Sequence, residues 1–434
     1  MLIYSPELSP RFNYILELIF GKLLGISYRT TNIKEEIIHH EGPCLNYSMT
    51  DIEGLPFLRA SGLLYEREII DQKKSLGAVF TWKNMPVFYP AGEPSILPFD
   101  IFAASFYMVA RYEEYLPFEA DEHNRFHSGE SIAFHNGFLD QPIINQWALQ
   151  FGKELTRIFS GNIQINPLEY QFKPTIDIDN AWAFLNKGLW RSMGALLRPG
   201  QSMAERNYRF QVWRKKQPDP FDQYEFIRQL MHSHQLDPIF FFLVGPYGPY
   251  DRNVSPANSG FKRLVRSLAS EFRLGIHPSY NSNSSAAQIQ KEIDILAHLS
   301  GKEITDSRQH FLKVHLPHTY SIIDNLGIKN DYSMGYADRV GFRAGIANPF
   351  RFFDLENNTS TDLVVHPFQV MDITLQEYLK LEPKEALDTI SQLVSTIKDV
   401  GGTFNCLWHN ESLGEWKHWT GWSGVFREML EIAG

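Results

Sequence analysis

Strand-like and helix-like segments alternate along the chain from about residue 166 onward, and this alternation limits the fold more than any other feature. Helix-like stretches such as DQYEFIRQLMHSHQL and SAAQIQKEIDILAHLSG separate the strand-like runs KPTIDID, DPIFFFLVG, RLGIH, HFLKVHL, DLVVHPF and TFNCLWHN. A wholly apolar run such as DPIFFFLVG is typical of a parallel sheet that is covered on both faces. Repeated β–α units therefore predict a parallel sheet, either open or closed into a barrel.

The first 165 residues show a mixed pattern without a clear repeat. Short strand-like runs such as GLPFLRA and GAVFTW precede the helix-like segment PFDIFAASFYMVARYEEYL. The polar, turn-rich segment DEHNRFHSGESIAFHNGFLDQP carries three histidines, which we expect to be solvated. A chain of 434 residues is long enough for two domains. We predict a smaller α+β domain of unknown role at residues 1–165 and an α/β domain at residues 166–434.

Charge, cysteine content and hydropathy exclude several classes of protein. The net charge of −9 argues against a general nucleic-acid-binding protein, which would need a basic face. Two cysteines cannot form a disulfide framework or a zinc ribbon. The most apolar early segment, PRFNYILELIFGKLLG, contains Arg11, Glu17 and Lys22, so it is not a membrane span. The first residues lack the pattern of a signal peptide, and we expect a cytoplasmic protein.

Polar side chains gather at the carboxyl ends of the predicted strands, where α/β folds build their sites. Asp177 and Asp179 end one strand, His277 follows another and His409 ends the last. Two carboxylates two residues apart point to the same side of a strand, so they need a cation, a shared proton or a nearby arginine. We interpret one as a metal ligand and the other as a general base. The alternative is a capping aspartate beside a solvated one.

Other residues are weaker candidates. Arg308 could hold a catalytic carboxylate ionised through a bidentate pair, or it could be a surface arginine. The flat ring of Trp408 could stack on a sugar or pack in the core. Arg339 and Arg343 lie among glycines and aromatic residues in GYADRVGFRAGIANPFRFFD. They could bind an acidic or phosphorylated substrate, or simply belong to a solvated loop.

Taken in order, these motifs resemble the polysaccharide deacetylase superfamily, which comprises carbohydrate esterase family four and the nodulation-type deacetylases. TIDIDNAW resembles the first motif of that family, Thr-Phe-Asp-Asp, with one residue inserted between the carboxylates. GIHPSYNS, SRQHF and LWHN resemble the second, third and final motifs. NDYSMGYADRVGFRAGIANPFRFFD is like the signature of a bacterial branch with an extra N-terminal domain. The resemblance covers residues 166–434, and more loosely PFDIFAASFYMVARYEEY.

The resemblance implies a distorted (β/α) barrel of the polysaccharide deacetylase type, with one divalent metal ion at its mouth and zinc as the expected ion. Carried over by position, Asp177 would be the general base and Arg308 would orient it. Asp179 and His277 would be metal ligands, and His409 would be the general acid.

One ligand of the family pattern is absent from its usual place. The second motif normally has another histidine four residues after the first, and Asn281 stands there in this chain. Asparagine is a poor zinc ligand, so we expect His310 of the third motif to serve as the third ligand.

The expected function is that of a metal-dependent hydrolase. It would remove an N-acyl group, acetyl above all, from a sugar or polysaccharide precursor by hydrolysis of a C–N amide bond that is not a peptide bond. The alternatives are a hydrolase of a non-sugar C–N bond on the same barrel and a degenerate carbohydrate-binding or scaffold protein. The sequence leaves the sugar, the role of the N-terminal domain and the oligomeric state open.

Overall fold

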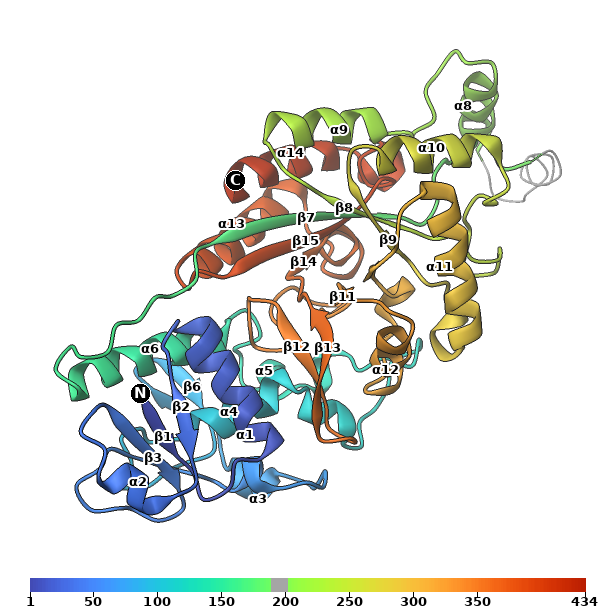
Figure 1. The fold of residues 1–434 in the computed structure, drawn as a ribbon. Coiled ribbons are helices and arrows are strands. Elements are labelled where there is room, and N and C mark those ends of the chain that lie inside the picture. The colour runs from blue at the N-terminus through green and yellow to red at the C-terminus, as the bar shows by residue number, and fades with distance from the viewer. Residues whose placement is uncertain (189–201) are drawn as a thin grey trace.

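The computed structural model describes residues 1–188 and 202–434 as a mixed α/β fold with two large sheets (Figure 1). Four strands form the sheet of the N-terminal part, and nine strands form the sheet of the C-terminal part. A short antiparallel pair, β5 (Phe80–Trp82) and β6 (Met85–Val87), completes the strands. No helix among the described residues is long and apolar enough to cross a membrane.

The N-terminal sheet is parallel throughout, with the strand order β2-β1-β3-β4. Its strands are β1 (Leu2–Tyr4), β2 (Arg29–Thr31), β3 (Cys44–Ser48) and β4 (Phe57–Arg59). The sequence analysis expected an α+β domain here and gave no strand pairing. Strands of three to five residues are too short to show a period in the sequence.

Helices surround this small sheet. α1 (Pro10–Leu16) starts with proline in its first turn and is capped by the Ser9 side chain, and it continues into a π-helix at Glu17–Leu23. The segment that we predicted as one long helix is α4 (Ile101–Val109) followed by a 3₁₀ turn at Tyr112–Tyr115. Arg111 separates the two because its φ of 54° is left-handed. The other helices of this part are α2 (Lys34–Ile38), α3 (Lys73–Leu76), α5 (Ile132–His135) and α6 (Ile143–Ile158).

The large sheet has the strand order β12-β13-β11-β10-β9-β8-β7-β15-β14. Its strands are β7 (Gln171–Ile178), β8 (Ile239–Phe242), β9 (Arg273–Ile276), β10 (Asp306–Ser307), β11 (Asn330–Asp331), β12 (Phe350–Asp354), β13 (Thr359–Val365), β14 (Val370–Met371) and β15 (Thr403–His409). All neighbours are parallel except the antiparallel pair β12 and β13. The parallel sheet expected from the β–α repeats is confirmed, whereas this strand order does not by itself demonstrate closure into a barrel.

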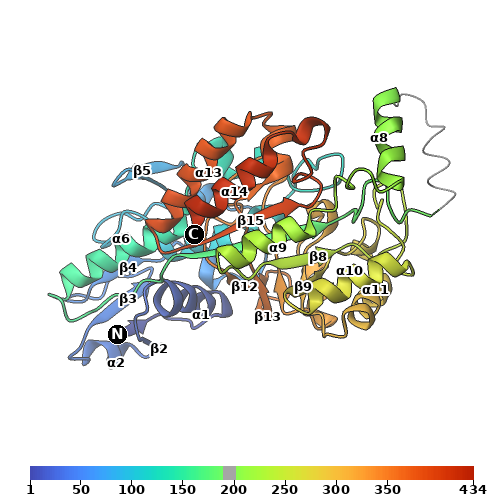
Figure 2. The same cartoon turned by 90° about the horizontal axis from the view of Figure 1, so that it is seen from above.

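Helices cover the large sheet from outside, and α9, α13 and α14 lie along β7, β8 and β15 in both views (Figures 1 and 2). The helices of this part are α8 (Met203–Trp213), α9 (Tyr224–Ser233), α10 (Ser259–Ala269), α11 (Ala286–Ser300), α12 (His318–Asn325), α13 (Pro383–Lys398) and α14 (Trp422–Ala433). One predicted strand is wrong. HFLKVHL is not a strand, because Phe311 and Leu312 both have left-handed φ angles and form a 3₁₀ turn at His310–Leu312.

The two parts of the chain share one hydrophobic core. Tyr14 of α1 and Phe106 of α4 both pack on Phe353 of β12, with ring centroids 5.1 and 5.0 Å apart. Tyr14 also donates a hydrogen bond to the Arg351 carbonyl. The division at residue 165 therefore stays a prediction, and the structure shows the two predicted domains packed together.

Candidate metal centre and catalytic site

The candidate site lies at the carboxyl ends of β7, β9 and β15 in the large sheet, where β8 separates β9 from β7. Asp177 and Asp179 stand at the end of β7, and His277 directly follows β9. His409 is the last residue of β15 and pairs in register with Asp177. The carboxyl ends of parallel strands meet at one edge, so side chains far apart in sequence converge there.

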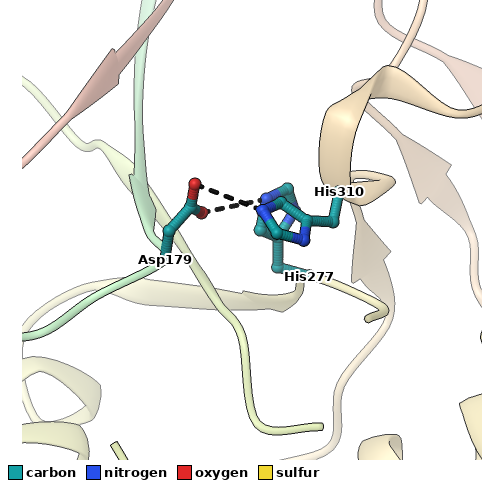
Figure 3. Close-up of side chains that lie close together, drawn as sticks. All are labelled: Asp179, His277 and His310. Atoms are coloured by element: carbon teal, nitrogen blue, oxygen red, sulfur yellow. Dashed lines mark ion pairs between the residues drawn. The ribbon is translucent and has the colours of Figure 1, made fainter. Parts of the chain in front are cut away.

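Asp179, His277 and His310 form a group that could hold a metal ion (Figure 3). Their ligand atoms all lie within 4.8 Å of one another. Asp179 Oδ1 lies 3.2 Å from His277 Nε2, and Asp179 Oδ2 lies 3.4 Å from His310 Nε2. Asp179 Oδ1 is buried and has no hydrogen-bond partner among the described residues. One carboxylate oxygen and two imidazole nitrogens are donors that suit zinc, so these residues fit a divalent ion.

The electrostatics of this group favour an ionised aspartate. Burial by itself would raise the pKa of Asp179, but His310 and His277 outweigh that effect and hold the pKa well below its usual value. The carboxylate is therefore charged, as a metal ligand must be.

Each histidine of the group is oriented through its second ring nitrogen. His277 Nδ1 lies 2.5 Å from the Arg308 carbonyl, and His310 Nδ1 lies 2.8 Å from Asp251 Oδ1. Such bonds fix the ring and leave Nε2 for a metal. Sequence reasoning missed Asp251, whose only signal was its place in the loop that follows β8.

Asp177 is paired with a buried arginine. Arg308 Nη1 donates to Asp177 Oδ1 over 2.8 Å, and Arg308 Nε donates to the Tyr332 carbonyl over 2.9 Å. The guanidinium carbon lies 4.7 Å from the centre of the Phe241 ring. That ring fills the space over Gly275, where a Cβ atom would come within 2.4 Å of it. Asp177 and Arg308 meet as predicted, but through one hydrogen bond rather than a bidentate pair.

His409 is held by a carboxylate that directly follows the neighbouring strand β14. His409 Nδ1 lies 2.8 Å from Asp372 Oδ1, and the His409 backbone N–H donates to Asp372 Oδ2 over 2.8 Å. Burial lowers the pKa of His409, but Asp372 outweighs this and raises the pKa to about 10. Asp372 follows β14, a two-residue strand that the sequence pattern did not reveal.

A cavity of about 220 Å³ opens onto these groups. Asp177, Asp179, His277, His310 and His409 all line it. Apolar side chains, among them Leu312, Met371 and Leu407, form part of the wall. Arg125 from the N-terminal part also lines the cavity, and sequence reasoning gave it no role.

The three residues predicted to bind substrate lie outside this cavity. Trp408 is fully buried and packs on Phe426 with a centroid distance of 5.3 Å. Its neighbour His409 faces the site, and alternation along β15 turns the two side chains to opposite faces. Arg343 is buried and bonded to Glu114, whereas the exposed Arg339 lies over the Phe134 ring.

Asn281 also stands apart from the metal-binding group. It is exposed and precedes a 3₁₀ turn at Ser282–Ser284, whereas His310 belongs to the group that could hold a metal ion. The role of His310 as the third ligand stays a prediction.

Comparison with known families and curated proteins gives one match. Residues 1–160 match a family of unknown function, DUF7033. No curated protein matches the chain.

Several solved structures of polysaccharide deacetylases match the chain. One from Mycobacterium smegmatis, assigned as a polysaccharide deacetylase, is 14% identical with a TM-score of 0.41, over 62% of this chain and 85% of the other. One from Pseudomonas aeruginosa PAO1, assigned likewise, is 8% identical with a TM-score of 0.38, over 61% and 84%. A CE4 family pseudoenzyme from Bacillus anthracis is 9% identical with a TM-score of 0.30, over 61% and 62%.

Proposed function

We propose that this protein is a metal-dependent hydrolase that removes an N-acyl group, acetyl above all, from a sugar or glycan precursor. The observation that carries the proposal is the convergence in one cavity of a three-residue ligand set, a carboxylate paired with arginine, and a histidine paired with aspartate. These are the parts that amide hydrolysis requires: a Lewis acid, a base and an acid. The resemblance of the sequence motifs to polysaccharide deacetylases supports a carbohydrate as the substrate.

Asp179, His277 and His310 would hold the ion. When bound, a divalent ion, zinc in our proposal, would polarise the amide carbonyl and acidify a water molecule. The buried Asp179 oxygen without a hydrogen bond would thereby gain a partner.

Asp177 would act as the general base. Arg308 donates to one of its oxygens, which fixes the orientation of the carboxylate. The other oxygen, Oδ2, lies 3.7 Å from His277 Nε2 and therefore close to the ligand set. Asp177 would take a proton from the water molecule as the oxygen of that water bonds to the carbonyl carbon.

His409 would act as the general acid. Its raised pKa keeps the imidazole protonated at neutral pH, and Asp372 holds Nδ1, so that Nε2 faces the cavity. His409 would give its proton to the amide nitrogen as the C–N bond breaks. The products are a carboxylic acid and a free amine on the sugar, and the two proton transfers balance.

The first test is metal content. The purified protein is incubated with zinc, dialysed and measured by mass spectrometry, with His310→Ala as the test variant and His318→Ala, at an exposed position, as the control. We expect about one zinc ion per chain in the wild type and the control, and far less in His310→Ala. Absence of bound metal from the wild type would refute the hydrolytic mechanism.

The second test is acetate release from N-acetylated oligosaccharides, assayed with the zinc-loaded wild type. Acetate release that depends on zinc would support the deacetylase. A zinc-loaded protein that releases acetate only from non-sugar acetamides would favour the other hydrolase of the sequence analysis. Binding of the oligosaccharides without turnover would favour a carbohydrate-binding protein. Zinc as the ion and a cytoplasmic location remain predictions.

A further inference from the structure

A short segment of the N-terminal part, Asp121–Phe126, lies against the turn that carries His310. Arg125 Nη1 donates to the Phe311 carbonyl over 2.6 Å. The His123 ring packs edge-on against the Phe311 ring, with centroids 4.7 Å apart. The residue that follows a candidate metal ligand is thus held by a segment almost two hundred positions earlier in the chain.

The His310 turn needs such support because its backbone is strained. Phe311 and Leu312 have φ angles of 59° and 53°, a region that non-glycine residues rarely adopt. Such a conformation persists only where surrounding contacts impose it. Within the C-terminal part, Asp251 bonds to the His310 ring, and the Tyr250 and Tyr280 rings pack against the Phe311 ring.

Arg125 is well placed to impose this conformation. Its side chain is nearly buried, and Nε donates to Asp121 Oδ2 over 2.7 Å. This bond fixes the orientation of the guanidinium that also contacts Phe311. Asp121 is in turn anchored by the backbone N–H groups of His123 and Arg125. A buried, charge-assisted bond of this kind holds its acceptor more firmly than a neutral one.

A second route leads from the same segment to the same histidine. His123 Nδ1 lies 3.1 Å from the Tyr280 hydroxyl. The Tyr280 backbone N–H donates over 2.9 Å to Asp251 Oδ1, the oxygen that also accepts from His310 Nδ1. Both the ring of His310 and the backbone of the next residue, Phe311, are therefore tied to the Asp121–Phe126 segment.

We propose that the N-terminal part completes the metal centre by holding His310 in its ligand position through Arg125 and His123. This gives a role to residues 1–160, and it explains how a ligand from the third motif serves where the second motif has Asn281. Arg125 and His123 are positioning residues, because they act through the His310 turn. The inference rests on the proposed function, since it assumes that the Asp179, His277 and His310 group binds a metal ion.

The test compares the zinc affinity of the full-length protein and its variants by competition with a chelating dye. Arg125→Met keeps the bulk of the side chain and removes the hydrogen bonds that the guanidinium donates to the Phe311 carbonyl and to the Asp121 carboxylate. We expect affinity 10- to 100-fold weaker, the usual effect of losing an outer contact of a metal ligand. Arg125→Lys, which keeps one charged donor, should restore part of the loss. His123→Leu gives a second variant in case Arg125→Met folds poorly.

Ser128→Ala is the matched control. Ser128 also joins the two parts of the chain, through Asp338, but none of its hydrogen bonds involves the His310 turn. Its affinity for zinc should equal that of the wild type.

A second readout reports on the ligand directly. The visible absorption of the cobalt-substituted protein depends on the number of ligands and their geometry. We expect the Arg125→Met spectrum to shift toward that of His310→Ala, whereas Ser128→Ala should give the wild-type spectrum. Unchanged affinity and spectrum in both Arg125→Met and His123→Leu, with metal bound to the wild type, would overturn this inference and leave the proposed function standing. A wild type without metal would instead refute the proposed function itself.

Discussion

The Asp177 carboxylate and the Arg308 guanidinium form a buried pair in which each group depends on the other. Both side chains are almost fully inaccessible to solvent, and aromatic rings surround the guanidinium. A charge in such a place is stable only when it is paired, so each group compensates the charge of the other at the cavity wall. The Asp177 carboxylate is thereby held beside the ligand set, where the proposed mechanism needs a general base.

Replacing Asp177 by asparagine should therefore abolish most activity and spare the metal. Asparagine keeps the size of the side chain but cannot take a proton, and loss of a general base typically lowers kcat by about 10² to 10⁴. Asp177 is not part of the three-residue group, so bound zinc should stay near the wild-type level. Kinetics of acetate release and metal analysis of the same sample check both points.

Asp237→Asn is the control for this substitution, because Asp237 is exposed and lies before β8, at the opposite edge of the sheet. Circular dichroism of both variants checks that the protein stays folded when Arg308 loses its charged partner. Full activity in Asp177→Asn would remove Asp177 from the mechanism.

Single residues at strand ends could be predicted from the sequence, because the pattern of a strand shows where the strand ends and which side chains follow it. Asp177, Asp179, His277 and His409 converge for that reason. Asp251 and Asp372 could not be found in this way, since one lies in a long loop and the other follows a strand of two residues. Trp408 shows that residue type alone can mislead. A tryptophan suits sugar binding, but Trp408 lies on the face of β15 that packs into the core.

At the scale of elements, the segments near β11 and β13 hold a half-buried histidine, His366, that the site does not use. The His366 ring stacks on the Tyr332 ring with centroids 4.4 Å apart, and His366 Nε2 lies 3.0 Å from Asn330 Oδ1. Burial, with smaller effects from Arg273 and Lys173, lowers the pKa of His366 to about 3. This histidine therefore stays neutral in the folded protein at pH values where an unfolded chain would protonate it.

The pH dependence of unfolding should report this histidine. In the unfolded chain His366 binds a proton below about pH 6.5, whereas in the folded chain it does so only near pH 3. Its contribution to stability is therefore full above the unfolded pKa and is lost as the pH falls from about 6.5 toward 3. The loss approaches about 1.4 kcal/mol per pH unit.

His366→Gln, which keeps a donor for Asn330 but does not titrate, should flatten the curve of unfolding free energy against pH between 6 and 4. Urea titrations at several pH values measure this slope, and His318→Gln, at an exposed position, is the control. A slope equal to that of the wild type would show that His366 is protonated alike in the folded and unfolded states.

The elements that sequence reasoning missed share a physical cause. HFLKVHL has the alternation of a strand, but two left-handed residues break it after His310. The turn contacts Arg125 and His123 of the N-terminal part and Tyr250 and Tyr280 of the C-terminal part, and no local pattern reports such contacts. The strands of the N-terminal sheet are too short for periodicity, whereas the long amphipathic helices of the C-terminal part were visible in the sequence.

At the scale of the whole molecule, a buried ion network joins the two parts of the chain. Glu114 accepts hydrogen bonds from Arg343 Nε and Nη2 over 2.9 and 2.7 Å and from Arg111 Nε over 2.7 Å. Arg111 also bonds to Glu113 and to the Tyr336 hydroxyl. The side chains of Arg111, Glu114 and Arg343 are each at most 2% exposed, so the network lies inside the shared core.

Breaking this network should destabilise the whole protein. Glu114→Gln removes the charge that two buried guanidinium groups share, and loss of one partner in a buried pair costs about 3 to 5 kcal/mol. Chemical denaturation measures the change. The matched control is Asp362→Asn, which breaks the exposed pair with Arg351 and should change stability very little. Equal effects of the two substitutions would show that the buried network contributes no more than a surface ion pair.

The overall plan was only partly open to prediction. Alternating strands and helices predicted the parallel sheet, because each β–α unit carries its own signal. The packing of the first 165 residues on the rest was not predictable, since it depends on contacts between residues more than two hundred positions apart. Arg343 illustrates this: its loop suggested a substrate site, and only the position of Glu114 shows that it is structural.

The pairing of Glu114 with Arg343 also constrains how this sequence can change over evolutionary time. A substitution at either position removes a partner from a buried charge, so it is less costly when the other position changes with it. Positions 114 and 343 should therefore vary together among descendants of this chain, and the two halves should be inherited as one unit. Recombination that joined the first half to an unrelated second half would separate these two partners at a single step.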